Sequence, residues 1–224
     1  MITIKDSITA EDLRYPKSTP YDTGYLDVGN GHRLFYQQYG NPQGPVVLLV
    51  HGGPGSGIEI GDNYTRLHDP SYFRIIAIDQ RGCGQSKPHV AVDTKKALRN
   101  NTPDQLADDF ELLRDHLNID AWHVFGYSWG ACLAPYYALR HPEHILSMTI
   151  GGMWMHTPDE IDWYINRMGL FFPEEEAKLL ALLPKTMKRF DRLDILYKAI
   201  TGRDQKQALK IAGAQGHFEH ICCY

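Results

Sequence analysis

Four short apolar runs constrain the fold of this chain more than any other feature: Val46–Val50, Ile75–Ile78, Trp122–Phe125 and Ile145–Ile150. Runs without regular polar alternation favour strands that are covered on both faces, as in a parallel sheet. Helical patterns lie between them, and the clearest begins where Thr102 can cap a helix and Pro103 suits its first position. We therefore predict a doubly wound, mostly parallel α/β sheet that binds ligands at the carboxyl ends of its strands.

The two ends of the chain depart from this pattern. Residues 23–28 and 32–39 alternate around an Asn-Gly pair, which predicts an antiparallel hairpin before the parallel strands. From Met153 onward the pattern is mostly helical, with no further strand run. We expect residues 1–152 to form the N-terminal part of the core and residues 153–224 to form a partial helical lid, or cap.

Composition and charge exclude several classes of protein. Of the 224 residues, 43% are hydrophobic and 22% are charged, which is typical of a globular chain and not of a disordered or coiled-coil one. The net charge of −4 offers no basic surface for nucleic acid. The sequence shows no membrane-spanning run and no secretory leader, and its four cysteines lack a disulfide spacing. We expect a cytoplasmic protein that binds neither nucleic acid nor membrane.

The segment Gly126-Tyr127-Ser128-Trp129-Gly130 matches the G-x-S-x-G pattern, with a strand run before it and a predicted helix, residues 129–140, after it. In this context the pattern is typical of a nucleophile elbow, in which a sharp turn exposes the serine hydroxyl. The backbone N–H of Trp129 would then lie at a helix N-terminus, beside an oxyanion formed at Ser128. A chance match is the alternative, because short patterns with two glycines recur.

Two more motifs follow predicted strands. His51–Gly55 follows the first apolar run, and its glycines would let backbone N–H groups approach a substrate as oxyanion donors, with a plain tight turn as the alternative. Asp79–Ser86 follows the second run, and we expect Asp79 and Arg81 to hydrogen-bond neighbouring loops rather than to react. Cys83 has no basic partner adjacent in sequence, so we do not expect a reactive thiol there.

With these three motifs in order, the chain resembles proline iminopeptidases (prolyl aminopeptidases) of the α/β-hydrolase fold. That family carries HGGPG, DQRG-x-G-x-S and a G-x-SWG elbow, which stand here as His51–Gly55, Asp79–Ser86 and Gly126–Gly130. The resemblance implies that the enzyme removes N-terminal proline from peptides without a metal or organic cofactor. It assigns Ser128 as the nucleophile, and the N–H groups of Gly53 and Trp129 as the oxyanion donors.

Members of that family bind the free amino terminus of the substrate with glutamates of the helical lid. Phe218-Glu219 is the comparable motif here, so the resemblance implies Glu219 as a substrate-binding residue, although Gln215 stands where an aromatic residue is expected. A carboxylate there would neutralise a buried prolyl ammonium group. An exposed helix glutamate is the alternative. The spacing of four nearby residues matches no standard zinc site: His217, His220, Cys222 and Cys223.

The remaining triad members have no obvious position in the sequence. In this fold the acid and the histidine follow the serine, on loops after two strands beyond the lid. We therefore expect both residues, and the C-terminal strands, to be missing from this chain, which is either a fragment or a truncated product. We also expect slow turnover, and an apolar sheet edge at Ile145–Ile150 that is prone to aggregation.

The sequence thus favours a serine aminopeptidase specific for N-terminal proline. A hydrolase of small esters or amides on the same fold is one alternative. A non-catalytic binding protein, or a truncated product without activity, is an alternative of a different class.

Overall fold

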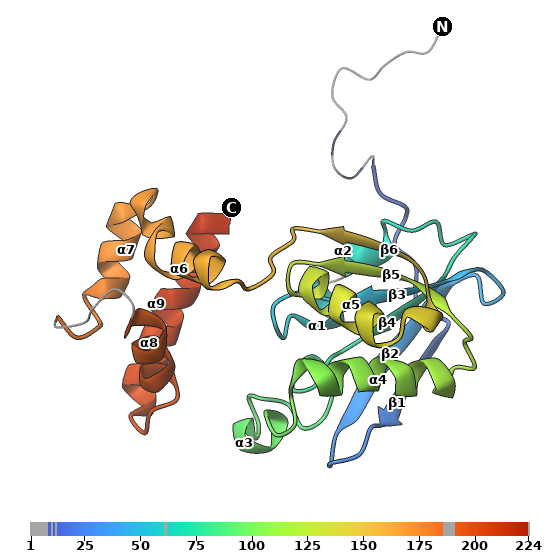
Figure 1. Ribbon diagram of the computed structural model, residues 1–224, viewed down its shortest axis with the longest axis horizontal. Coiled ribbons are helices and arrows are strands. Elements are labelled where there is room, and N and C mark those ends of the chain that lie inside the picture. Colours follow the sequence, from blue (N-terminus) through green and yellow to red (C-terminus); the bar gives the residue numbers. More distant parts are fainter. Residues whose placement is uncertain (1–8, 10, 12, 61, 186–190, 224) are drawn as a thin grey trace, which may run out of the picture. The chain divides into compact units, whose positions relative to one another are not determined.

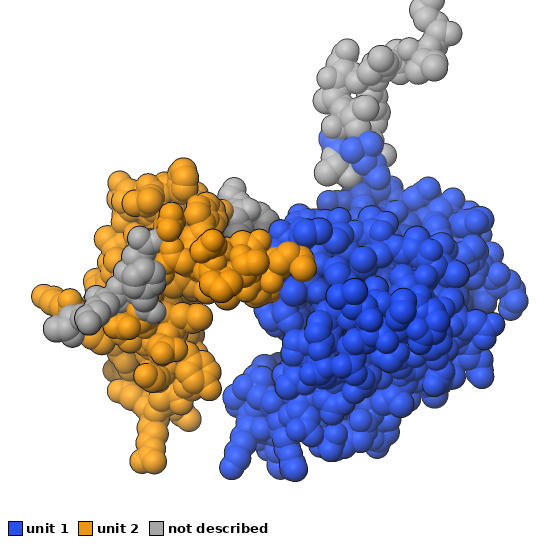
Figure 2. Space-filling model, viewed as in Figure 1, with its two compact units in different colours: residues 1–154 blue, residues 155–224 orange. Residues whose placement is uncertain are grey.

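The computed structural model describes residues 9, 11, 13–60, 62–185 and 191–223. The chain divides into two compact units, Met1–Trp154 and Met155–Tyr224 (Figure 2). The first unit contains a mixed sheet with helices on its faces, and the second unit is helical (Figure 1).

The sheet has six strands in the order β1-β2-β4-β3-β5-β6. The strands β1 and β2 form the predicted antiparallel hairpin, β2 also pairs antiparallel with β4, and the pairs β3·β4, β3·β5 and β5·β6 are parallel. The predicted hairpin and parallel strands are therefore confirmed. The strands are β1 (Asp22–Asp27), β2 (Arg33–Gly40), β3 (Val46–Val50), β4 (Arg74–Ile78), β5 (Trp122–Tyr127) and β6 (Ile145–Gly151).

Helices connect the parallel strands as predicted. Thr102 caps α4, its side chain accepting a hydrogen bond from the backbone N–H of Gln105, and α5 occupies the residues expected for the second helix. The helical elements of this unit are α1 (Gly57–Ile60), α2 (Asp62–Thr65), α3 (Thr94–Ala97), α4 (Pro103–His116), α5 (Trp129–Arg140) and the 3-10 helix η1 (Pro142–His144).

The main core of the first unit lies where α4 and α5 pack on the sheet (Figure 1). Phe110 of α4, Trp122 of β5 and Tyr137 of α5 are almost completely buried there, and the indole of Trp122 donates to the hydroxyl of Tyr137 at 3.1 Å. Burying each such side chain contributes about 1.5–3 kcal/mol. This packing fixes the position of α5, and with it the turn at the start of that helix.

The strand β6 lies at the end of the sheet order and, among the described strands, pairs with β5 alone. Two of its apolar side chains are exposed, Leu146 at 59% and Met148 at 39%. The expected apolar sheet edge at these residues is therefore present in the part of the chain that the structure describes. An open apolar edge of this kind favours pairing with other strands.

The second unit has a small core of its own, formed by Met168, Leu179, Leu196, Ile211 and Phe218 among others. The predicted helical pattern is confirmed, while a role as a lid stays a prediction. No described helix is both long enough and apolar enough to cross a bilayer. The elements are α6 (Pro158–Asn166), the 3-10 helix η2 (Met168–Leu170), α7 (Pro173–Leu180), α8 (Arg192–Ile200) and α9 (Gln205–Cys223).

Candidate active site

Ser128 occupies the sharp turn between β5 and α5, at the carboxyl end of a central strand. Its backbone angles are φ 56° and ψ −122°, which non-glycine residues rarely adopt. The flanking glycines make the turn possible. A Cβ atom on Gly126 would lie 2.2 Å from the carbonyl oxygen of Gly130, and one on Gly130 would lie 2.0 Å from that of Val50. The geometry is therefore that of a nucleophile elbow.

The loop after β3 lies directly against this serine. A Cβ atom on Gly52 would lie only 3.7 Å from Ser128 Oγ, so the backbone of the loop, without side chains, approaches the hydroxyl. Gly53 has φ 116°, a conformation that glycine adopts readily and other residues do not. Trp129 is the first residue of α5, at the positive end of the helix dipole. Gly53 and Trp129 thus lie on the two segments that flank the serine, and their role as oxyanion donors stays a prediction.

Gln80, in the loop after β4, connects these two segments. Its side-chain Nε2 donates to the carbonyl oxygen of His51 at 3.0 Å, and its Oε1 accepts from Nε1 of Trp129 at 3.0 Å. One amide side chain therefore joins the loop after β3 to the first turn of α5. Sequence reasoning did not single out Gln80, because an amide inside a motif gives no signal of the partners that it bridges.

The imidazole of His51 is fully engaged in holding the same loops. Its Nε2 accepts the backbone N–H of Gln80 at 3.0 Å, and its Nδ1 lies 2.9 Å from the carbonyl oxygen of Gly52 and 3.3 Å from the backbone nitrogen of Gly57. His51 is 3% exposed, and burial lowers its pKa. A neutral ring with both nitrogens hydrogen-bonded positions backbone and is not placed to act as a base for Ser128.

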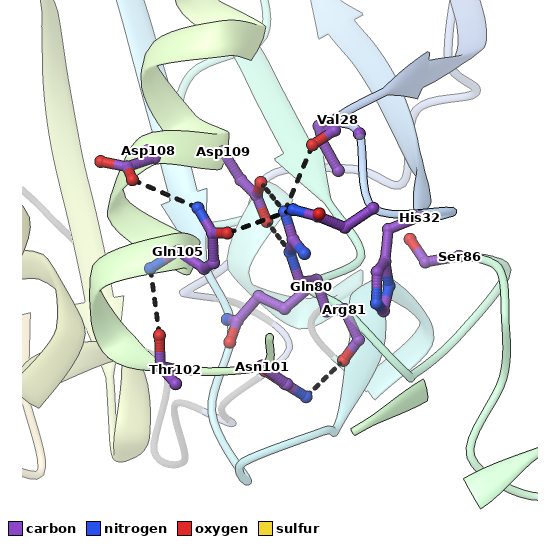
Figure 3. A network of polar contacts seen from close by, with 12 residues as sticks. Val28, His32, Gln80, Arg81, Ser86, Asn101, Thr102, Gln105, Asp108 and Asp109 are labelled. Carbon is purple, nitrogen blue, oxygen red and sulfur yellow. Dashed lines mark hydrogen bonds and ion pairs between the residues drawn. The ribbon is translucent and has the colours of Figure 1, made fainter. Parts of the chain in front are cut away.

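Asp79 and Arg81 stabilise the loops, as expected from the sequence. The carboxylate of Asp79 accepts the backbone N–H groups of Ile58 at 2.6 Å and Gln85 at 2.7 Å. Arg81 forms a bidentate ion pair with Asp109 of α4, with Nε and Nη2 each 2.7 Å from a carboxylate oxygen (Figure 3). Both side chains of this pair are almost completely buried. The side chains of Asp79 and Arg81 in the motif after β4 thus form internal hydrogen bonds and an ion pair that stabilise the loops.

Cys83 lies in the same motif as Asp79 and Arg81, and it lines a cavity of about 500 Å³. Burial and the charge of Asp79 raise the pKa of its thiol to about 12, so it is protonated at neutral pH and a poor nucleophile. The cavity touches both glycine-rich loops and the elbow helix. Its lining includes Pro54, Gly55, Gln80, Leu98 and Trp129. The cavity provides apolar space beside the loop after β3, which is predicted to supply an oxyanion donor.

Among the residues that the structure describes, none forms a hydrogen bond with Ser128 Oγ. His141 and His144 lie beyond the far end of α5, and a helix of 12 residues is about 18 Å long. Neither histidine is therefore placed to act on the serine. That the triad acid and histidine lie outside this chain stays a prediction.

Glu219 lies in α9 of the second unit, half-buried, and its Oε1 accepts a hydrogen bond from Nε2 of Gln215 at 2.9 Å. The preceding residue, Phe218, is buried in the helical core at 2% exposure. Gln215, which replaces the expected aromatic residue, therefore holds the carboxylate of Glu219. A substrate-binding role for Glu219 is a proposal.

The four residues whose spacing matches no standard zinc site also lie in α9: His217, His220, Cys222 and Cys223. His217 Nε2 lies 3.3 Å from Oε2 of Glu175, which pairs it with α7, and Cys222 forms no disulfide with another described residue. The side chain of Cys223 lies outside the described residues. In the described part of the chain, these residues do not form a cluster of three or more possible metal ligands.

The chain is similar to known proteins along most of its length. Residues 45–210 match the family model described as alpha/beta hydrolase fold. The chain is 40% identical over 202 residues to a proline iminopeptidase of Xylella fastidiosa (strain 9a5c), a match that covers 90% of this chain and 61% of that protein. It is 34% identical over 211 residues to a proline iminopeptidase of Arabidopsis thaliana, covering 94% of this chain and 53% of that protein.

A solved structure supports the fold. A proline iminopeptidase-related protein from Thermus thermophilus superposes with a TM-score of 0.56 and 23% identity, covering 90% of this chain and 70% of that one. The chain spans about three fifths of the length of the Xylella relative, 61%. The resemblance to proline iminopeptidases that the three motifs predict is confirmed by these relatives. Because the family model covers most of its length, the chain belongs to the α/β-hydrolase fold family.

Proposed function

We propose that this chain serves in a serine hydrolase that releases N-terminal proline from peptides, with Ser128 as the nucleophile. The observation that carries this proposal is the elbow: a serine at φ 56°, at the carboxyl end of β5, with the backbone of Gly52 packed against it. The names of the relatives supply the substrate class. A cytoplasmic location belongs to the same proposal, supported by the finding that Cys83, Cys132 and Cys222 form no disulfide among the described residues.

The proposed reaction is acyl transfer. Ser128 Oγ attacks the carbonyl carbon of the N-terminal prolyl residue, its proton passes to a general base, and the carbonyl oxygen becomes an oxyanion. The backbone N–H groups of Gly53 and Trp129 stabilise that oxyanion, and loss of one such donor costs about 2.7–4 kcal/mol of transition-state stabilisation. The peptide bond then breaks, the shortened peptide leaves with a protonated amine, and water releases proline from the ester.

Recognition of the substrate rests on its free ammonium group. We assign Glu219 to that group, because a buried cation needs an opposite charge. The hydrogen bond from Gln215 restricts the carboxylate of Glu219 without neutralising it. A hydrolase of simple esters would have no use for a carboxylate in this role.

The test uses the 224-residue chain and a fluorophosphonate probe, whose reaction requires an activated serine. We expect slow labelling at Ser128, located by mass spectrometry, that is absent in Ser128→Ala and unchanged in Cys83→Ser. A boronic acid analogue of proline should protect Ser128 from the probe, because its tetrahedral adduct occupies the oxyanion site.

The matched arm uses the N-acetylated boronic acid, which lacks the ammonium group. Protection by the free amine at concentrations at least about tenfold lower is the expected result, since loss of a charge-assisted contact costs about 1.4 kcal/mol or more. Equal protection by both compounds would favour the small ester or amide hydrolase. Failure of the probe to label Ser128 at all would favour a chain that is non-catalytic by itself.

A further inference from the structure

A second cluster of reactive side chains lies far from the elbow, where α4 packs beside the end of α5. It comprises Glu111 of α4, His141 directly after α5 and His144 of η1. One donor atom from each residue lies within 4.8 Å of the donor atoms of the other two. The α5 helix separates this cluster from Ser128 by about 18 Å, so it takes no part in the proposed hydrolysis.

One ring nitrogen of each histidine lies in the same small region, beside the carboxylate of Glu111. Nε2 of His141 and Nδ1 of His144 are both shielded from solvent, and neither forms a hydrogen bond within the described part of the chain. The two rings are nearly parallel, with an interplanar angle of 8° and centroids 6.3 Å apart. Buried ring nitrogens normally find a partner; Nε2 of His141 has no hydrogen bond among the described residues, and Nδ1 of His144 faces only carboxylate oxygens, so their proximity points to a shared ligand.

Glu111 provides the third possible ligand, a carboxylate whose orientation is fixed by hydrogen bonds. Its Oε2 lies 2.8 Å from Nδ1 of His144 in a geometry that is not a hydrogen bond. Tyr137 donates to Oε1, and Arg114 donates to Oε2 from Nη2 at 3.0 Å and from Nε at 3.1 Å. A carboxylate that coordinates a metal is typically held by such outer hydrogen bonds.

We propose that Glu111, His141 and His144 bind a divalent transition-metal ion of the zinc class. Two imidazoles and one carboxylate are ligands that suit Zn²⁺, Co²⁺ and Ni²⁺, and do not suit Mg²⁺ or Ca²⁺, which prefer oxygen. Ligand atoms at about 2.0–2.1 Å from one ion lie roughly 3.3 Å apart in a tetrahedron, and the three donor atoms lie within 4.8 Å of one another. Water or the exposed Glu143, whose Oε1 is 4.0 Å from Nδ1 of His144, can fill a fourth position.

The ion would tie α4 to the end of α5 on the main core. Its expected effect is therefore on stability, because a ligand that binds only the folded chain raises the unfolding temperature with its concentration. The charge of Arg114 beside Glu111 opposes binding, so we expect an affinity weaker than that of a site with a free carboxylate.

The experiment titrates ZnCl₂ and CoCl₂ into the metal-free 224-residue chain by calorimetry, with the absorption spectrum of Co²⁺ as a second readout. We expect one site, visible Co²⁺ bands of low-symmetry coordination, and a higher unfolding temperature with Zn²⁺. His144→Ala should weaken binding at least about tenfold and remove the bands. This variant is chosen because its side chain is 26% exposed, and circular dichroism without metal checks that it folds.

Two variants serve as matched controls. His116→Ala removes an exposed histidine from the last turn of the same α4 helix, and Cys83→Ser removes the thiol near His51 and Asp79, the other described group of possible ligands. Both should retain Zn²⁺ affinity and the Co²⁺ bands. Absence of binding at millimolar Zn²⁺, or binding that His144→Ala leaves unchanged, would overturn the proposal and leave an ion pair between His144 and Glu111.

Discussion

The loops that follow β3 and β4 lie at the same edge of the sheet, and both are rich in glycine, yet they differ in what their polar groups do. In the loop after β4, the carboxylate of Asp79 and the guanidinium of Arg81 are used in internal bonds. In the loop after β3, Gly52 and Gly53 present backbone alone beside the serine. The difference teaches that a motif can identify a family by residues that stabilise loops, as Asp79 and Arg81 do. The proposed chemistry depends instead on the neighbouring loop after β3, which presents few side chains.

The largest effect should come from breaking the buried ion pair. Arg81→Ala leaves Asp109 as an uncompensated charge that is 1% exposed, so we expect a loss of about 3–5 kcal/mol in the free energy of unfolding. Urea unfolding followed by circular dichroism measures it. Lys96→Ala, which removes an exposed pair with Asp93, is the control and should cost less than about 1 kcal/mol. Equal losses in the two variants would contradict a bracing role.

A smaller loss is expected from Asp79→Asn. The amide keeps the shape of the side chain but turns one of its two acceptors into a donor that faces a backbone N–H. Hydrogen bonds to a charged group contribute about 1.5–3 kcal/mol, so we expect a loss of about 2 kcal/mol. Asp69→Asn, in an exposed turn with Ser71, is the matched control. A loss in Asp69→Asn as large as that in Asp79→Asn would show that the buried hydrogen bonds of Asp79 contribute no more to stability than those of an exposed turn.

The sequence predicted the parts of this comparison that depend on local pattern. The strands, the capped helix at Thr102 and the turn at Ser128 follow from hydrophobic runs and glycine positions within a few residues of each other. Gln80 bridges His51, which is 29 positions away in sequence, and Trp129, which is 49 positions away. No local sequence pattern predicts contacts at such separations. The cluster of Glu111, His141 and His144 was missed for the same reason, because α4 and α5 meet only in the folded chain.

His51 connects the two loops, and its titration should appear in the pH dependence of stability. Burial lowers its folded pKa, so below about pH 6.5 the unfolded chain binds a proton that the folded chain does not. Stability should therefore fall as the pH drops below about 6.5, by up to about 1.4 kcal/mol per pH unit from this residue. Unfolding of His51→Gln between pH 7 and pH 5 should show a shallower slope than the unsubstituted chain. His116→Gln, at an exposed position, should keep the original slope, and a slope unchanged in His51→Gln would exclude His51 as its source.

The smallest predicted effect has the opposite sign and concerns the elbow itself. Ser128 is held at φ 56° and ψ −122°, and such backbone costs about 1–3 kcal/mol for a residue with a Cβ atom. Ser128→Gly relieves this strain but adds about 0.4–1 kcal/mol of freedom to the unfolded chain. We therefore expect a net gain of about 1 kcal/mol over Ser128→Ala, which lacks the same hydroxyl but keeps the Cβ atom. Thermal unfolding of the two variants isolates the backbone term, and both should fail to react with the fluorophosphonate probe. A glycine variant less stable than the alanine variant would mean that the turn stores no strain, whereas the expected order would show that the fold holds Ser128 in an unfavourable backbone conformation.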